Sequence, residues 1–299
     1  MDQFDNPAPT VALPGLVGEQ QSWLRRIRSW LHILHPFPSL VVAATGVGFA
    51  ALASSRPLAA DHWARLACVL AASQFAVGAF NDYCDADLDA AAKPGRPIPS
   101  GLATRSGALL ATIALVAATV ALAASFGPST LAFTVVGTAA GLAYDGLLKR
   151  TPWSWAPYVL GLPILPLWSW STLGELPPAA GWVYPFGALL ALALHIANAL
   201  PDEESDREAG AGGLVQFLGR PASLVIIFLA FGLASAFGLV VGYLAPGPPP
   251  RGLAIPLGGS IGLVALALAT RPATDRAAFP LLAVGSGPLA IGVAAVLVA

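Results

Sequence analysis

Long apolar runs alternate with short polar segments along nearly the whole chain. Nine of these runs have roughly the 20 residues that a helix needs to cross a bilayer. They lie at 37–55, 62–81, 104–126, 129–147, 154–172, 182–200, 221–243, 252–270 and 278–298. Several contain Pro or Gly, which transmembrane helices tolerate. The pattern predicts an all-α membrane protein with nine transmembrane helices.

The chain before the first run has two parts. Residues 1–20 are rich in Pro, Gly and acids, and we expect them to be disordered. Residues 22–34 place apolar side chains on one helical face with arginines between them, which is typical of an amphipathic helix at a membrane surface. We therefore divide the chain into an N-terminal segment, 1–35, and a transmembrane domain, 36–299. No cleaved signal peptide is expected.

Composition supports a membrane protein. Only 10% of the 299 residues are charged and 56% are hydrophobic, whereas a soluble domain carries about 25% charged residues. A net charge of −1 argues against nucleic acid as a partner. Cys68 and Cys84 lack the spacing of a zinc site, and we expect both to be reduced thiols.

The basic residues predict the orientation in the cell membrane. With a cytoplasmic N-terminus, the only basic residues outside are Arg56, Arg65 and Arg251, and the other twelve of the fifteen lie inside. The positive-inside rule favours this multi-pass topology. It places the acidic clusters of the chain on the cytoplasmic side.

Two sets of Asn and Asp follow the second and sixth runs with identical spacing. The second set lies 117 residues after the first, and the two are Asn81, Asp85, Asp89 and Asn198, Asp202, Asp206. Matched sets on one side of the membrane predict two parallel four-helix repeats, with the ninth helix added. The bundle is expected to enclose a central cavity.

The spacing of these sets has a chemical meaning. Positions i, i+4 and i+8 share one helix face, Asp82 can join the first set, and Asp87 points elsewhere as a solvated charge. Carboxylates crowded in this way repel one another unless cations lie among them. Oxygen ligands favour Mg²⁺, which typically binds one or two carboxylates plus substrate phosphates. Pro201 is expected to break the sixth helix.

Basic residues on the same side can bind phosphate oxygens. Lys149 ends the sequence AYDGLLKR, close to Tyr144 and Asp145, and this favours a functional role. For Arg96, phosphate binding and topology are equally good interpretations. Topology alone accounts for three others, Arg150, Arg207 and Arg220.

These residues give the chain a resemblance to the UbiA superfamily of intramembrane prenyltransferases. NDYCDADLD matches the family's NDxxDxxxD motif, DEESD matches its second DxxxD motif, and AYDGLLKR resembles its tyrosine-then-lysine loop. The resemblance covers nearly the whole chain and implies a nine-helix bundle with a cytosolic cap. His35-Pro36 departs from the basic residue that many members have there, and the role of His35 stays open. Leu200-Pro201 replaces their second Asn-Asp pair.

The resemblance implies transfer of a prenyl group from an isoprenyl diphosphate to a hydrophobic acceptor, often an aromatic ring. Two or more Mg²⁺ ions, with Mn²⁺ as a substitute, would bridge the two sets at Asn81, Asp82, Asp85, Asp89, Asn198, Asp202 and Asp206. The diphosphate would contact Asn81, Arg96, Tyr144, Lys149 and Asn198. The catalytic residues would be Asp82, Asp85, Asp89, Asp202, Asp206 and Lys149. RPIPSG, residues 96–101, is similar to members that combine geranylgeranyl-type donors with chlorin or glycerophosphate acceptors.

Two alternatives stay open. A membrane terpene cyclase of the same fold needs the same metal residues, so donor chain length, acceptor and type of product are not fixed by the sequence. A transporter or lipid-binding scaffold is the remote alternative. A transporter would carry its charged residues at the membrane midplane, whereas the charged residues of this chain lie at one face. Among the aromatic residues, Tyr158 and Phe80 are candidates for the pocket. An interfacial belt is the better interpretation of the tryptophans, Trp153, Trp155, Trp168 and Trp170.

Overall fold

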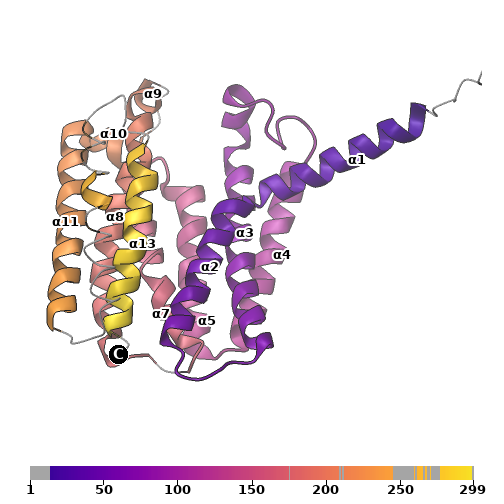
Figure 1. Cartoon of the computed structure of the whole chain (residues 1–299). Coiled ribbons are helices and arrows are strands. Elements are labelled where there is room, and N and C mark those ends of the chain that lie inside the picture. Colours follow the sequence, from indigo (N-terminus) through magenta and orange to yellow (C-terminus); the bar gives the residue numbers. More distant parts are fainter. Residues whose placement is uncertain are drawn as a thin grey trace, which may run out of the picture.

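The computed structural model describes residues 14–174, 176–208, 210, 212–244, 259, 261–264, 267, 270 and 277–297. This part of the chain contains helices and no strand (Figure 1). The helices are α1 (Pro14–Ile33), α2 (Pro36–Ala53), α3 (Ala60–Ala92), α4 (Arg105–Ala124), α5 (Pro128–Ala143), η1 (Tyr144–Leu148), α6 (Ala156–Gly161), α7 (Ile164–Ser171), η2 (Pro178–Trp182), α8 (Val183–Ala199), η3 (Leu200–Asp202), α9 (Glu203–Glu208), α10 (Leu214–Leu218), α11 (Arg220–Leu244) and α13 (Ala278–Leu297).

Within the described residues, seven helical segments are long and apolar enough to span a membrane, and they match seven of the nine predicted runs. The fifth run differs, because two short helices, α6 and α7, replace one continuous span. The break falls at Leu162 and Pro163, where proline lacks the N–H that a continuous helix needs and clashes with the preceding turn. Most of the eighth run, 252–270, lies outside the described residues. The nine-helix count and the two-repeat relationship therefore stay predictions.

Helix α1 leaves the bundle, as Figure 1 shows, and exposes an apolar face. Trp23, Leu24 and Leu31 are 61%, 57% and 54% exposed, as an amphipathic surface helix requires. The helix begins at Pro14, so the disorder expected for residues 1–20 is wrong for 14–20. Residues 1–13 lie outside the described part of the chain.

The core has two main clusters. One joins α2, α3 and α7 through Ala50, Leu66 and Trp168. The other joins α8, α11 and α13 through residues such as Ile196 and Phe231. Figure 1 shows the same division, with α2–α5 on one side and α8, α11 and α13 on the other. The two ends of the bundle therefore bring together loops from both halves of the chain.

The burial of two tryptophans contradicts the predicted interfacial belt. Trp153 is 63% exposed, as expected of an interfacial belt. Trp168 and Trp170 are buried, and Trp168 donates a hydrogen bond of 2.6 Å to Thr134 Oγ1. The belt interpretation is wrong for these two residues, because the broken helix turns them inward.

Candidate active site

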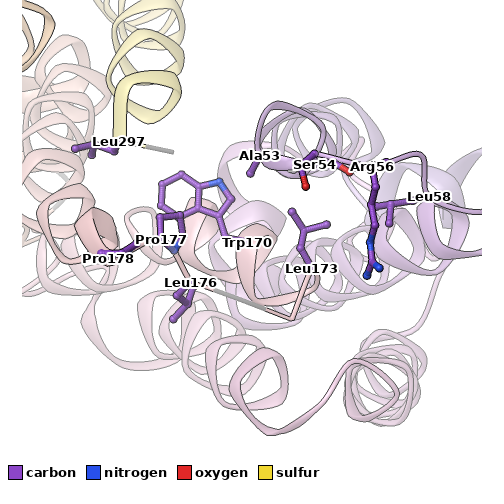
Figure 2. Close-up of a pocket in the computed structure, with 11 residues that line it drawn as sticks. Ala53, Ser54, Arg56, Leu58, Trp170, Leu173, Leu176, Pro177, Pro178 and Leu297 are labelled. Atoms are coloured by element: carbon purple, nitrogen blue, oxygen red, sulfur yellow. Dashed lines mark hydrogen bonds between the residues drawn. The ribbon is translucent and has the colours of Figure 1, made fainter. Parts of the chain in front are cut away.

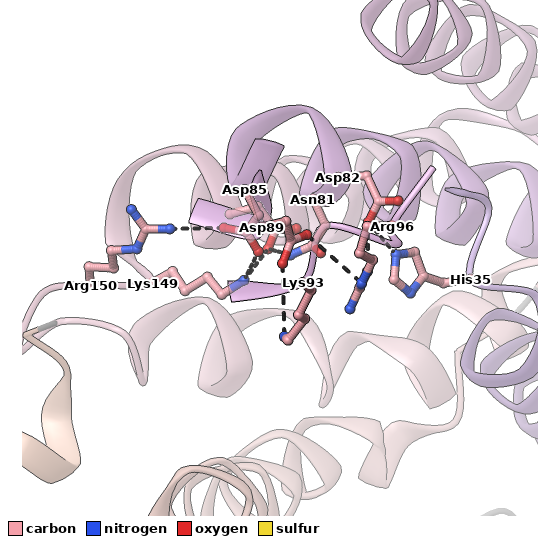
Figure 3. A network of polar contacts seen from close by, with 10 residues as sticks. His35, Asn81, Asp82, Asp85, Asp89, Lys93, Arg96, Lys149 and Arg150 are labelled. Carbon is pink, nitrogen blue, oxygen red and sulfur yellow. Dashed lines mark hydrogen bonds and ion pairs between the residues drawn. The ribbon is translucent and has the colours of Figure 1, made fainter. Parts of the chain in front are cut away.

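The first Asn/Asp set lies in the last turns of α3. This helix has 33 residues and is therefore about 50 Å long at 1.5 Å per residue, more than the roughly 30 Å of a bilayer core. Its polar end carries Asn81, Asp82, Asp85 and Asp89 together (Figure 3). Asp82 and Asp89 are buried at 3% and 8% exposure. Buried carboxylates need partners, and the surrounding elements supply them.

Asp82 is held by two basic side chains from different elements. His35 Nε2 lies 2.8 Å from Asp82 Oδ1, and Arg96 Nη1 lies 3.1 Å from the same oxygen. Arg96 Nε is also 3.9 Å from Asp89 Oδ2, and Lys93 Nζ is 3.9 Å from Asp89 Oδ1. The segment after α3 thus folds back over the helix end and places its cations against the carboxylates.

Asp85 is held by the segment after α5. Lys149 Nζ donates to Asp85 Oδ2 at 2.6 Å, and Arg150 Nη2 donates to Asp85 Oδ1 at 3.0 Å. A single π-helical turn, η1, precedes Lys149, and such turns are frequent at functional sites. Within it, Asp145 Oδ1 accepts a hydrogen bond of 2.6 Å from Asn81 Nδ2. Two contacts therefore fix this turn against α3.

Tyr144 turns toward a second group of side chains. Its ring packs edge-on against Tyr158, with centroids 5.0 Å apart, and lies 6.1 Å from the ring of His195. Tyr144, which is predicted to contact the diphosphate, therefore lies beside aromatic side chains of α6 and α8, although its neighbour Asp145 faces α3.

The second set does not lie on one continuous helix. Asn198 is exposed near the end of α8, Asp202 ends the 3-10 turn η3, and Asp206 lies in α9. The predicted break at Pro201 is confirmed. Because of this break, the prediction that the three residues of this set share one helix face is wrong. Gln216 Nε2 donates to Asp206 Oδ2 at 3.3 Å.

Electrostatics connect the two sets. Burial raises the pKa of the Asp206 carboxyl, the charge of Asp202 raises it further, and the charges of Lys149 and Lys93 oppose the rise. The same lysines contact the first set, so α9 lies within electrostatic reach of the first site. Asp87, by contrast, is exposed and pairs with Arg105 at 3.0 Å. This agrees with the prediction that Asp87 is a solvated charge.

The residues present fit a divalent cation. Among the described residues, no three metal-ligating side chains already converge, because basic partners hold the carboxylates. However, Asp82 Oδ2 is buried without a hydrogen-bond partner in that part of the chain. Such an orphaned oxygen is costly unless a ligand completes it. Mg²⁺ needs only one or two carboxylates plus phosphate oxygens, so this donor set suits it.

Three residues of the site were not assigned by the sequence. The sequence leaves the role of His35 open, explains Arg150 by membrane topology alone, and assigns no role to Asp145. Their contacts depend on how distant segments meet, and spacing along one helix cannot reveal that. His35 has a left-handed backbone, with φ of 46°, which is unusual for a residue other than glycine.

Comparisons with known proteins identify the family. The family model for UbiA prenyltransferases matches residues 39–297. The chain belongs to the UbiA prenyltransferase family. The UbiA resemblance found in the sequence is thereby confirmed, and the protein is an enzyme of the prenyltransferase class and a multi-pass membrane protein.

Individual UbiA relatives show how far the similarity extends. Digeranylgeranylglyceryl phosphate synthase of Methanopyrus kandleri is 30% identical over 226 residues, 74% of this chain and 79% of that protein. Protoheme IX farnesyltransferase of Pyrobaculum neutrophilum is 33% identical over 230 residues, covering 72% and 81%. A UbiA homologue from Archaeoglobus fulgidus, solved bound to GPP and Mg²⁺, has a TM-score of 0.72 at 18% identity, covering 90% and 99%.

Proposed function

We propose that this protein is a Mg²⁺-dependent prenyltransferase that moves an isoprenyl group from its diphosphate to a hydrophobic acceptor. The observation that carries the proposal is the ring of basic groups around the carboxylates of α3. Such an arrangement suits an anion and a cation that bind together. The N-terminus and both Asn/Asp sets are proposed to face the cytoplasm, in line with the distribution of basic residues.

The basic residues and the two Asn/Asp sets would bind different partners, the diphosphate and the metal. Lys149 and Arg96 would leave their carboxylate partners for the oxygens of the diphosphate, with Tyr144 beside them. The freed carboxylates would then hold the metal. The proposed metal ligands are Asn81, Asp82, Asp85, Asp89, Asn198, Asp202 and Asp206. When bound, Mg²⁺ neutralises the charge that develops on the leaving diphosphate.

An apolar cavity of about 220 Å³ suits the prenyl chain. It lies among α2, α7, α8 and α13 and is lined by residues such as Phe49, Leu190 and Leu194. Leu194 precedes Asn198 by one turn of α8, so the cavity and the second set share a helix. Apolar walls also exclude water, which would otherwise convert the allylic cation to an alcohol.

The proposed reaction breaks the bond between C1 of the donor and its oxygen, and the electron pair leaves with the diphosphate. A nucleophilic atom of the acceptor then bonds to C1, and the acceptor loses one proton. Lys149 and Arg96 stabilise the diphosphate charge in a partly buried site, where such contacts are stronger than in water. The acceptor and the length of the donor chain are questions for experiment.

The test uses purified protein in lipid nanodiscs with a panel of prenyl diphosphates, with and without candidate phenol and lipid acceptors. Diphosphate release and the mass of the products are measured. Transfer that stops in excess EDTA and returns with Mg²⁺ or Mn²⁺ supports the proposal, and undiminished transfer in EDTA contradicts it. Asp85→Asn and Asp202→Asn are expected to abolish diphosphate release. A cyclic hydrocarbon formed from the donor alone would assign the protein to the terpene cyclases instead.

A further inference from the structure

A second cavity lies at the opposite end of the bundle. Helix α2 begins next to His35, in the active site, and ends at Ala53, in the wall of this cavity. The cavity has a volume of about 380 Å³, within the range typical of ligand pockets. Figure 2 shows its lining, which comes from the ends of α2, α7 and α13 and from the loops beside them.

Trp170 lines this cavity and holds a buried hydrogen-bond donor beside it. Its side chain is 1% exposed, and among the described residues its Nε1–H has no partner. Trp168, two residues earlier in the same helix, donates its Nε1–H to Thr134 at 2.6 Å. A buried donor without an acceptor is unfavourable, so the contrast indicates that Trp170 meets an acceptor supplied from elsewhere. In Figure 2 the indole nitrogen faces Ala53 and Ser54.

Arg56 supplies a positive charge to the same cavity. In the part of the chain that the structure describes, no hydrogen bond or ion pair involves its guanidinium group. Arg65, at the same end of the bundle, is instead paired with Asp61 at 3.1 Å. The loop that carries Arg56 is fixed, because Ser54 Oγ donates to the Arg56 carbonyl at 2.7 Å. The cavity therefore holds a cation and a buried donor, and both favour an anion.

The remaining walls indicate what the anion is attached to. Leu176, Pro177, Pro178 and Leu297 line the cavity away from Arg56 (Figure 2). One end thus carries the cation of Arg56 and the hydroxyl of Ser54 beside Leu58, and the other end is apolar. A free anion would leave the apolar end in contact with water, whereas a lipid would fill both ends. The long arginine side chain is also suited to the level of the lipid headgroups.

We propose that this cavity binds the phosphate headgroup of a phospholipid from the leaflet opposite the active site. Arg56 would pair with the phosphate, Trp170 Nε1–H would donate to one of its oxygens, and the lipid chains would follow the apolar walls. This site is separate from the diphosphate site and does not depend on the proposed reaction.

The test counts bound lipids by native mass spectrometry on the full chain in detergent. The probes are dioleoylphosphatidylglycerol, dioleoylglycerol, which has the same chains without phosphate, and inorganic phosphate. We expect one retained phospholipid, no retention of dioleoylglycerol, and no displacement by inorganic phosphate at concentrations similar to that of the lipid. Arg56→Gln and Trp170→Phe should each weaken retention about tenfold, since each removes one charge-assisted hydrogen bond.

Arg65→Gln is the matched control and should retain the lipid as the unmodified protein does. The Tm should be unchanged in all three variants, which checks that they fold, and diphosphate release should be unchanged as well. Equal lipid retention by Arg56→Gln and the unmodified protein would overturn the proposal, as would equal binding of dioleoylglycerol. Displacement by inorganic phosphate at similar concentration would assign the site to a free anion instead.

Discussion

Lys149 Nζ lies 2.6 Å from Asp85 Oδ2, although 64 residues separate them along the chain. The π-helical turn before Lys149 and the last turns of α3 are joined by this contact. The same amine lies 3.9 Å from Asp145 Oδ1, so it is shared between two carboxylates. Lys149 therefore offsets the charge of two acids, and in the proposed reaction it would exchange them for phosphate oxygens.

The first prediction concerns this amine. Lys149→Met should lower the rate of diphosphate release at least 100-fold, the order expected when one donor to a developing anion is lost. Lys149→Arg keeps the charge but not the compact geometry, and its rate should lie in between. Steady-state assays with saturating donor make the comparison, and the Tm checks folding. A Lys149→Met enzyme that turns over as fast as the unmodified enzyme would rule out this role.

The second prediction separates the two features of His35, its imidazole and its backbone. His35→Asn and His35→Val both remove the contact with Asp82 and should both reduce diphosphate release. Only valine conflicts with the left-handed backbone, because asparagine tolerates that conformation and β-branched residues do not. His35→Val should therefore be less stable than His35→Asn by about 1–3 kcal/mol. Equal Tm values for the two variants would show that the backbone strain is unimportant.

The third prediction concerns the close approach that brings His35 to the site. A Cβ at Gly78 would lie 3.0 Å from the carbonyl oxygen of Leu34, a backbone atom that cannot move alone. Gly78→Ala should shift the corner before α2, weaken the contact of His35 with Asp82, and lower both Tm and activity. Gly48→Ala is the control, because its Cβ would meet nothing within 4 Å. If both alanine variants behave alike, the close packing at Gly78 does not position His35.

The sequence predicted the parts of this site that depend on one helix. Asn81, Asp85 and Asp89 follow helical spacing, and α3 carries them as a group. The break at Pro201 also followed from a local rule, since proline cannot continue a helix. Pro163 divides the fifth run in the same way, but membrane helices also tolerate proline, so this residue alone does not predict a break.

The contacts that sequence could not predict join distant segments. His35 meets Asp82 across 47 residues, and Arg150 meets Asp85 across 65. A basic residue near a membrane helix has the same local pattern whether it sets topology or holds a carboxylate. Trp168 and Trp170 illustrate the same limit, because burial by a neighbouring helix and exposure to headgroups suit the same residue type.

The last prediction uses the raised pKa of Asp206 in metal-free protein. Below its ordinary value of 3.8 the carboxyl is protonated in the folded and unfolded states alike, and it does not affect stability. As the pH rises through 3.8 and then through the raised pKa of the folded state, ionisation is harder in the folded protein, so stability falls. Asp206→Asn removes this cost and keeps an oxygen for Gln216. Its Tm should therefore exceed that of the unmodified protein at pH 7, with a difference that shrinks toward pH 4.

Adding Mg²⁺ should raise the Tm of the unmodified protein more than that of Asp206→Asn, because the proposed metal site needs the carboxylate. A lower Tm for metal-free Asp206→Asn at pH 7 would mean that this carboxylate is stabilised by its basic neighbours more than burial disfavours it.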